Sequence, residues 1–440
     1  MHSKEKFSPS TAAAIVVANM IGTGVFTSLG YQLVDIQSGF VILVLWVLGG
    51  IVAICGSLCY AELSARLPRS GGEYNFLGNI YHPMAGFISG FVSATVGFAA
   101  PTALAAITFG AYFASVFPSL SPLLLGTALV IATTVIHATS HRNSAGLQSF
   151  FTAAKIIVII VFSVAALVFV EDMQTISFVP NAADIPILTS GSFAVALIYV
   201  GYAYSGWNAA TYLTDELENP AKSLPLVLAL GTGVVMVSYL LLNFVFLSVA
   251  PVDAMVGKIE IGYIAAHYAF GEVGAAIMGV TLALLLISTV SAMIIAAPRV
   301  LQVVGEDFHV FRLLGRVNKH NIPATAVYFQ GITTLLFMWT ASFDSILVFS
   351  GVTMALNTLF AVVGLFVLRR RDKIKNNAEQ VTFRIPLYPL PPLIFIAVTG
   401  WTLVYLAIER PFEVFFGVCV IVLGAIGYLI ARRWDVKLER

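Results

Sequence analysis

Two clusters of small and hydroxyl-bearing residues interrupt long apolar stretches of this chain. They are Gly22-Thr23-Gly24 and the run from Tyr202 to Gly206. A helix broken inside a membrane releases N–H and C=O groups where no water can pair with them. The N–H groups that open a half-helix favour an anion, and the carbonyls that close one favour a cation. Two such ends could hold the carboxylate and ammonium groups of an α-amino acid. For a single Gly-x-Gly, close helix packing is the alternative.

The composition indicates an integral membrane protein. Of the 440 residues, 59% are hydrophobic and only 10% are charged, whereas a soluble domain carries about 25% charged residues. A membrane-spanning helix needs about 20 apolar residues, and the sequence predicts twelve such spans. The predicted spans are 10–34, 40–66, 84–116, 121–139, 146–170, 190–214, 223–250, 271–300, 322–341, 344–369, 388–408 and 412–431.

The distribution of Lys and Arg predicts the orientation in the membrane. With the N-terminus in the cytoplasm, 20 of the 23 Lys and Arg residues fall on the inner side. Only Lys258 and Arg410 then fall outside, and Lys155 falls within a span. Because inner loops are enriched in positive charge, we expect both termini to be cytoplasmic and the number of spans to be even.

The positions of the two breaks predict an inverted repeat. The first break lies in span one and the second in span six, so each half contains five spans. Because five is odd, the two halves enter the membrane from opposite sides. We therefore expect an all-α fold with unwound helices 1 and 6. The predicted units are residues 1–170 (spans 1–5), 190–375 (spans 6–10) and 385–432 (two accessory spans).

Several motifs resemble the amino acid–polyamine–organocation superfamily, and the resemblance covers almost the whole chain. The run from Asn19 to Phe26 resembles the Gly-Ser-Gly signature of that superfamily. The motifs that resemble its L-type amino acid transporter branch are Tyr204 to Asn208, Glu216 to Pro220 and Ser223-Leu224-Pro225. Further matches are Ala61-Glu62-Leu63, Pro68 to Tyr74, Pro101, Arg299 and Phe383 to Pro386.

The resemblance implies a substrate site at mid-membrane and alternating access. It implies that the substrate carboxylate contacts the backbone of Gly22 and Gly24 and the backbone and hydroxyl of Thr23. It also implies that the amino group contacts carbonyls near Met20, Tyr202, Ala203 and Ser205. Tyr202 takes the position of an aromatic lid, where Phe or Trp is usual. The residues that the resemblance suggests for the side-chain pocket or gate are Thr102, Tyr202 and Tyr204.

Lys155 is the only Lys or Arg well inside a predicted span, and ionisable groups at such depth are costly and usually functional. In the family that this chain resembles, a lysine in span five stands where sodium-coupled relatives hold a sodium ion. Its ammonium could bridge the first broken helix and span eight near Ser288 and Ser291, or it could release a proton during the cycle. The alternative is a lysine that extends to the interface, about 13 Å away along the helix.

These observations predict a sodium-independent transporter of neutral L-amino acids, since no Asp or Glu in a span is placed to meet a cationic side chain. Exchange of one amino acid for another is the first expectation, and proton-coupled symport is the alternative. A channel would need rings of charge or carbonyl filters repeated between subunits. An intramembrane enzyme would need a motif such as Gly-x-Ser-x-Gly or His-Glu-x-x-His, and neither occurs.

We expect no metal, cofactor or nucleic acid partner. His137 and His141 are four residues apart but have no third ligand, and the three cysteines lie in apolar spans. Eukaryotic L-type relatives pair with a glycoprotein through a cysteine between spans three and four. The loop at 117–122 has no cysteine here and the chain has no Asn-x-Ser/Thr site, so we expect no disulfide-linked heavy subunit. The expected location is the plasma membrane of a prokaryote.

Overall fold

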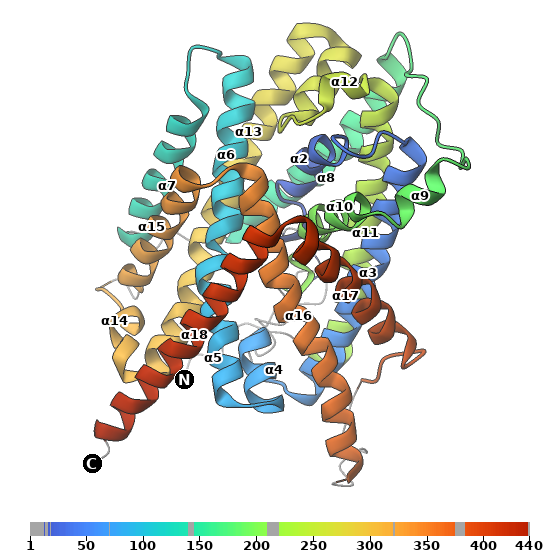
Figure 1. The fold of residues 1–440 in the computed structure, drawn as a ribbon. Helices are drawn as coiled ribbons and strands as arrows, with labels where there is room; N and C mark the ends of the chain where they lie inside the picture. The colour runs from blue at the N-terminus through green and yellow to red at the C-terminus, as the bar shows by residue number, and fades with distance from the viewer. Residues whose placement is uncertain are drawn as a thin grey trace.

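The computed structural model describes residues 13, 16–17, 19–69, 71–139, 145–208, 220–319, 322–374 and 383–438. Throughout these residues the regular structure is helical, and the helices run mainly along the long axis of the molecule (Figure 1). The fold is therefore that of an all-helical protein. The motif from Glu216 to Asn219 and His141 lie outside the described residues.

Eight helices in the described part of the chain are long and apolar enough to cross a membrane. Seven of them are α3 (Gly39–Arg66), α7 (Pro122–Thr139), α11 (Pro220–Val249), α13 (Ile261–Asp307), α16 (Phe343–Ile374), α17 (Leu390–Glu409) and α18 (Pro411–Leu438). The eighth, Pro83–Val116, consists of α5 (Pro83–Val92), the π-helix η1 (Ser93–Gly97) and α6 (Ala99–Val116).

The other four predicted spans coincide with shorter helices or with helices that are described only in part. They are α2 (Gly24–Gln32), α8 (Ala145–Phe169), α10 (Gly191–Ala203) and α15 (Ala324–Thr340). The remaining short elements are α4 (Gly72–Ile80), α9 (Asp184–Leu188), α12 (Val252–Met255), η3 (His309–Phe311) and α14 (Arg312–Gly315). The helical content thus follows the apolar pattern, although fewer than twelve helices have full membrane length among the described residues.

Local sequence explains where several helices begin. Ser38 and Ser190 accept hydrogen bonds from backbone N–H groups in the first turns of α3 and α10, at 3.3 and 3.1 Å. At the start of α5, the His82 ring accepts from the N–H of Met84, and Pro83 occupies the first helical position. These contacts satisfy N–H groups that have no partner within the helix. The starts of α3, α5 and α10 are therefore encoded locally.

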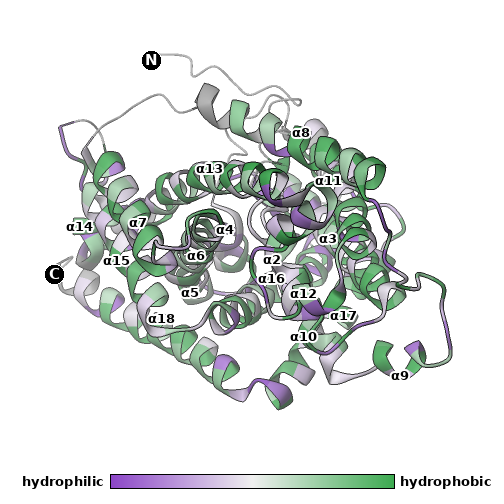
Figure 2. Cartoon of the chain, turned by 90° about the horizontal axis from the view of Figure 1, so that it is seen from above, coloured by the Kyte–Doolittle hydropathy of each residue, from purple (hydrophilic) through white to green (hydrophobic). Residues whose placement is uncertain are grey.

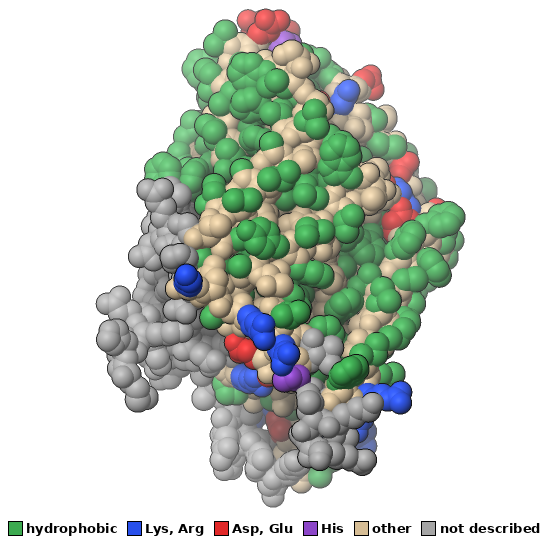
Figure 3. Space-filling model, turned by 90° about the vertical axis from the view of Figure 1, so that its left-hand side faces the viewer, with side chains coloured by type: hydrophobic (Ala, Val, Ile, Leu, Met, Phe, Trp, Pro, Cys, Tyr) green, Lys and Arg blue, Asp and Glu red, His purple; other side chains and the backbone are tan. Residues whose placement is uncertain are grey.

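The surface distribution of apolar side chains fits a lipid environment. Large hydrophobic side chains are exposed along α8 and α18, among them Val168 at 69% and Phe412 at 75%. Figure 2 shows hydrophobic residues on the outer helices around the bundle. In the face shown in Figure 3, hydrophobic side chains cover most of the middle, and most charged side chains lie toward the ends. Such exposure marks an interaction surface, and here the lipid bilayer is the matching partner.

Candidate substrate-binding site

The first interrupted segment is not helical between residues 21 and 23. Helix α2 begins at Gly24, and the side chain of Thr23 does not cap it. The N–H of Gly22 donates to the carbonyl of Met20 at 2.8 Å. Since the first N–H groups of an α-helix have no intrahelical partner, the start of α2 offers donors and a positive helix end to an anion.

The second interrupted segment follows α10, which ends at Ala203. Residues 204–206 form a turn, and Gly206 has a φ of 99°. This left-handed conformation favours glycine. The N–H of Ser205 donates to the carbonyl of Tyr202 at 3.0 Å. The helix therefore ends here, and its last carbonyl groups lie at the end of a half-helix.

Glycines allow the two interrupted segments to meet. A β-carbon on Gly24 would lie 2.4 Å from the Cα atom of Ala203, and one on Gly206 would lie 2.7 Å from the carbonyl oxygen of Asn19. Both distances are too short for any real β-carbon. In Figure 1, α2 and α10 accordingly lie side by side near the centre of the molecule. The residues that break each helix also bring the two helices together.

A cavity of about 670 Å³ adjoins both breaks. Eight of the residues predicted for the site line it: Met20, Gly22, Thr23, Gly24, Tyr202, Ala203, Tyr204 and Ser205. Within the described part of the chain its lining contains no Asp, Glu, Lys or Arg. Its size is within the usual range for small-molecule sites, and the described part of its wall carries no formal charge.

Tyr202 and Thr23 connect the two breaks directly. Their hydroxyl oxygens lie 3.1 Å apart, within hydrogen-bond distance, and either group can donate. Tyr202 therefore extends from α10 over the start of α2. A phenol at this position can exchange its contact with Thr23 for a contact with a ligand.

Tyr239 of α11 contacts both breaks and did not emerge from the sequence. Its hydroxyl oxygen lies 2.6 Å from the carbonyl oxygen of Met20 and 3.1 Å from that of Ala203, and its single proton can be donated to either. Its ring packs against Trp46 and Tyr204, with centroid distances of 5.5 and 5.1 Å. A lone tyrosine in an apolar span carries no local signal for such a role. The structure thus adds a fixed donor behind the two carbonyl groups.

We expect Tyr239→Phe to weaken substrate binding about tenfold, because the variant keeps the ring and removes the only hydrogen-bond donor that Tyr239 offers to the carbonyls of Met20 and Ala203. The measurement is the dissociation constant for an amino acid on the purified protein. Tyr405→Phe, on α17, serves as control, since its hydroxyl is exposed and only approaches Thr189. Equal affinities in all three proteins would contradict the role of Tyr239.

Lys155 is buried in α8, with 4% of its surface exposed. Its ammonium donates to the hydroxyl of Thr289 in α13 at 2.8 Å. The sequence pointed instead to Ser288 and Ser291. The hydroxyl of Ser288 donates to the carbonyl of Leu285, and that of Ser291 pairs with the His137 ring at 2.7 Å. Thr289 lines the cavity and Lys155 does not, so the lysine reaches the cavity wall through Thr289.

Thr102 lies behind the cavity wall. It is fully buried, its hydroxyl donates to the carbonyl of Phe98 at 2.6 Å, and Gln330 approaches it at 3.4 Å. Pro101, one residue earlier, does line the cavity. The pocket wall in this region is therefore formed by the neighbouring face of α6.

Aromatic and charged residues of α2, α10 and α16 meet near Arg410, which follows α17. Tyr31 stacks on Phe343 with centroids 5.4 Å apart. The hydroxyl of Tyr199 donates to Asp344 at 2.5 Å, and Arg410 forms an ion pair with the same carboxylate at 2.8 Å. The cavity instead includes Gly71, Tyr74 and Val300 in its lining, toward α4.

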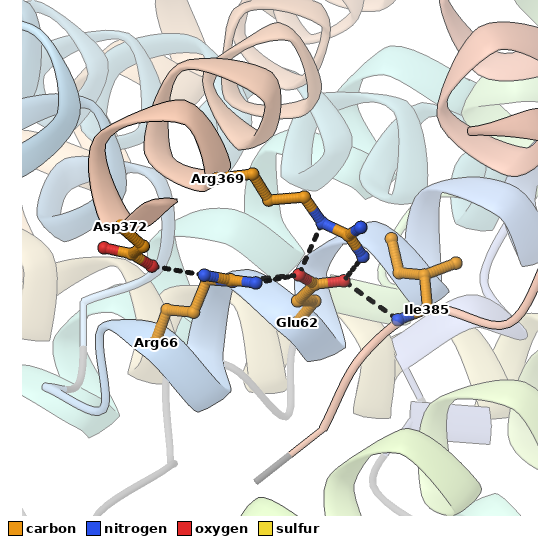
Figure 4. Close-up of polar contacts among 5 residues, drawn as sticks. All are labelled: Glu62, Arg66, Arg369, Asp372 and Ile385. Atoms are coloured by element: carbon orange, nitrogen blue, oxygen red, sulfur yellow. Dashed lines mark hydrogen bonds and ion pairs between the residues drawn. The ribbon is translucent and has the colours of Figure 1, made fainter. Parts of the chain in front are cut away.

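An ionic cluster joins three segments near the α4 end (Figure 4). Glu62 of α3 is fully buried and accepts hydrogen bonds from Arg66, from Arg369 of α16 and from the N–H of Ile385. Its distances to Arg66 and Arg369 are 2.6 and 2.5 Å. Arg66 also pairs with Asp372. The cluster ties α3 to α16 and to the segment that precedes α17.

We expect Glu62→Gln to lower the free energy of unfolding by about 3–5 kcal/mol, because it leaves two arginines without their buried anion. The measurement is the melting temperature of the purified protein. Glu306→Gln is the matched control, since Glu306 is exposed and, among the described residues, its carboxylate accepts a hydrogen bond from Gln302 alone. A melting temperature unchanged by the Glu62 variant would show that the cluster contributes little.

Comparison with known proteins identifies the family. Residues 7–427 match the model of the family described as Amino acid permease. The chain belongs to the amino acid permease family. The match confirms the resemblance to the amino acid–polyamine–organocation superfamily and makes this chain a multi-pass membrane protein of amino acid transport rather than an enzyme.

Two mammalian relatives of this permease illustrate the similarity. The b(0,+)-type amino acid transporter 1 of Mus musculus is 27% identical over 429 residues, which cover 94% of this chain and 85% of the relative. The Large neutral amino acids transporter small subunit 2 of Homo sapiens is 28% identical over 450 residues, which cover 99% and 82%. These matches agree with the L-type branch of the superfamily.

Proposed function

We propose that this permease is a sodium-independent exchanger of neutral L-amino acids that works by alternating access. The observation that carries the proposal is the meeting of two interrupted helices at one cavity, at Gly24 and Ala203. One break presents N–H groups and the other presents carbonyls. This pair of helix ends matches the two charges of an amino acid backbone.

In this proposal each break holds one end of the substrate. The carboxylate contacts the backbone of Gly22 and Gly24 and the hydroxyl and backbone of Thr23. The amino group contacts carbonyls at Met20, Tyr202, Ala203 and Ser205. Tyr202 acts as the lid, and its contact with Thr23 supports that role. Tyr204 supports the second break, since its hydroxyl donates to the carbonyl of Trp46 at 3.1 Å.

Neutral side chains are the proposed substrate class. The cavity wall has no charged residue within the described part of the chain, so an ionic side chain would lose its hydration without a counter-charge. The human relative is named for large neutral amino acids. Lys155 serves coupling in this proposal: its buried ammonium takes the place of a transported sodium ion, and its contact with Thr289 supports that role.

The proposed architecture has twelve membrane spans with both termini in the cytoplasm. Spans 1–5 (residues 1–170) and 6–10 (residues 190–375) form the inverted repeat, and residues 385–432 are accessory. Helices α2 and α10 are both short half-helices, one in the first span of each proposed repeat, and this supports the arrangement. The α4 end of the cavity then faces the cytoplasm, and the cluster of Tyr199, Asp344 and Arg410 faces outside.

The proposed location is the plasma membrane, without a disulfide-linked partner. The name of the human relative calls it a small subunit. In this chain Cys55, Cys59 and Cys419 are all free, and all three lie within α3 or α18. A covalent partner would need a cysteine outside the bundle.

Uptake into liposomes tests the mode of transport. We expect labelled alanine to enter liposomes loaded with unlabelled alanine, with no sodium present, and to enter empty liposomes far more slowly. An imposed proton gradient is the discriminating condition. Accumulation in empty liposomes that depends on the proton gradient would replace exchange by proton-coupled symport, in which Lys155 would release the proton.

A further inference from the structure

The cavity extends beyond the two breaks into a space beside α17, the helix that the sequence assigned to the accessory pair. We define the side lobe as the part of the cavity lined by Val52 and Ala53 of α3, Gly201 of α10, and Phe395, Val398, Thr399 and Thr402 of α17. It is part of the same cavity as Thr23 and Ser205. A ligand held at the breaks therefore has direct access to it.

The face of α10 that carries Gly201 points toward α17. Phe193, Leu197 and Gly201 follow one another at intervals of four and so share a face of the helix. Phe193 contacts Trp401 of α17, with ring centroids 6.3 Å apart. A β-carbon on Gly201 would meet no atom within 4 Å. The glycine is therefore not needed for helix packing, and its missing side chain leaves open space in front of α17.

Residues of η1 and α16 line another part of the cavity, where these two elements lie close to each other. A β-carbon on Gly97 would lie 3.0 Å from the sulfur of Met354. The cavity thus has little spare room between these two residues, whereas it is open at Gly201. The part of the cavity beside Gly201 therefore offers a substrate side chain more open space than the part between Gly97 and Met354.

Two hydroxyl groups in the side lobe have no hydrogen-bond partner among the residues that the structure describes. Thr399 and Thr402 lie three residues apart on α17 and are 9% and 5% exposed. Other threonines in the helices, such as Thr108 and Thr353, donate to the carbonyl four residues earlier, each at 2.7 Å. Neither Thr399 nor Thr402 has a hydrogen bond to a described residue. Their hydroxyls can therefore bind a ligand in an otherwise apolar lobe.

We propose that the side lobe receives the substrate side chain and selects neutral side chains larger than that of alanine. The inference rests on the proposed function, because it places the amino acid backbone at the breaks. Val52, Phe395 and Val398 pack against an aliphatic or aromatic side chain. Thr399 and Thr402 accept or donate a hydrogen bond where that side chain ends in a hydroxyl or amide.

Filling the side lobe tests the proposal. The full chain is reconstituted in liposomes, and uptake of labelled alanine is inhibited with unlabelled alanine, leucine or phenylalanine. We expect Gly201→Val to raise the ratio of the leucine to the alanine inhibition constant about tenfold, and the phenylalanine ratio at least as much. Gly400→Val on α17 is the control: a β-carbon there also meets no atom within 4 Å, and Gly400 does not line the cavity.

The outcomes separate the two proposals. Ratios that stay the same in Gly201→Val, or that rise equally in Gly400→Val, overturn the side lobe as the side-chain site while amino acid transport stands. A wild-type protein whose alanine uptake no amino acid inhibits overturns the proposed function and this inference with it.

Thr402→Val and Thr399→Val provide a second test that does not change the volume of the lobe. We expect the ratio of the tyrosine to the phenylalanine inhibition constant to rise about fivefold in at least one variant, with the leucine-to-alanine ratio unchanged. An unchanged tyrosine-to-phenylalanine ratio in both variants would contradict the role of the hydroxyls. This test also applies if Gly201→Val does not fold.

Discussion

Gly24→Ala should weaken substrate binding about a hundredfold or more. The new β-carbon would lie 2.4 Å from the Cα atom of Ala203 and 2.6 Å from its β-carbon, so α2 and α10 must separate. The N–H groups at the start of α2 and the carbonyls at the end of α10 then no longer face one ligand at the required spacing. A displacement of about 1 Å is enough for a loss of this size. The measurement is amino acid binding to the purified protein.

Gly233→Ala is the matched control for this variant. Gly233 lies within α11, does not line the cavity, and has no atom within 4 Å of a β-carbon. We expect normal binding in this control and a normal elution profile for both proteins. Unchanged binding in Gly24→Ala would show that the close approach of the two breaks is not required for the site.

Lys155→Met should reduce the exchange rate about a hundredfold. Methionine fills a similar volume but has no charge, so the charged contact with Thr289 across α8 and α13 is lost. Hydrogen bonds to charged groups contribute enough free energy for an effect of this size. The measurement is the initial rate of alanine exchange in liposomes, compared at equal protein content.

Lys258→Met is the control for charge removal, because Lys258 is exposed in the segment between α12 and α13 and does not line the cavity. We also expect Thr289→Val to slow exchange, since it removes the acceptor and leaves Lys155 buried. Normal exchange by Lys155→Met would reduce Lys155 to a structural residue of α8.

The two breaks could be predicted because their cause is local. Gly22, Gly24 and Gly206 stand within apolar stretches, and the structure is non-helical at 21–23 and 204–206. The same breaks explain why two of the predicted spans, 10–34 and 190–214, contain short helices. The mean hydropathy stays high across Gly24 and Ala203, so it does not reveal the breaks. The helices α2 and α10 contain only 9 and 13 residues.

The other residues around the breaks could not be predicted, because their positions depend on contacts between segments that are far apart in the sequence. Tyr239 lies 36 residues from Ala203, to whose carbonyl its hydroxyl can donate. Thr289 is 134 residues from Lys155, and the adjacent Ser288 points elsewhere because neighbouring residues on a helix face different directions. The contribution of α17 to the cavity had no signal at all, since its apolar sequence suits lipid and protein contacts equally.

The buried ammonium group of Lys155 on α8 has a consequence for the energetics of the proposed exchange. In the proposed mechanism this cation belongs to the polypeptide and does not cross the membrane, so reorientation of the carrier dissipates no ion gradient. Such a carrier leaves the total number of internal solutes constant and alters only which ones they are. Under the proposed exchange, net accumulation of amino acids then depends on another uptake system, and the amino acids that it imports are exchanged outward by this carrier.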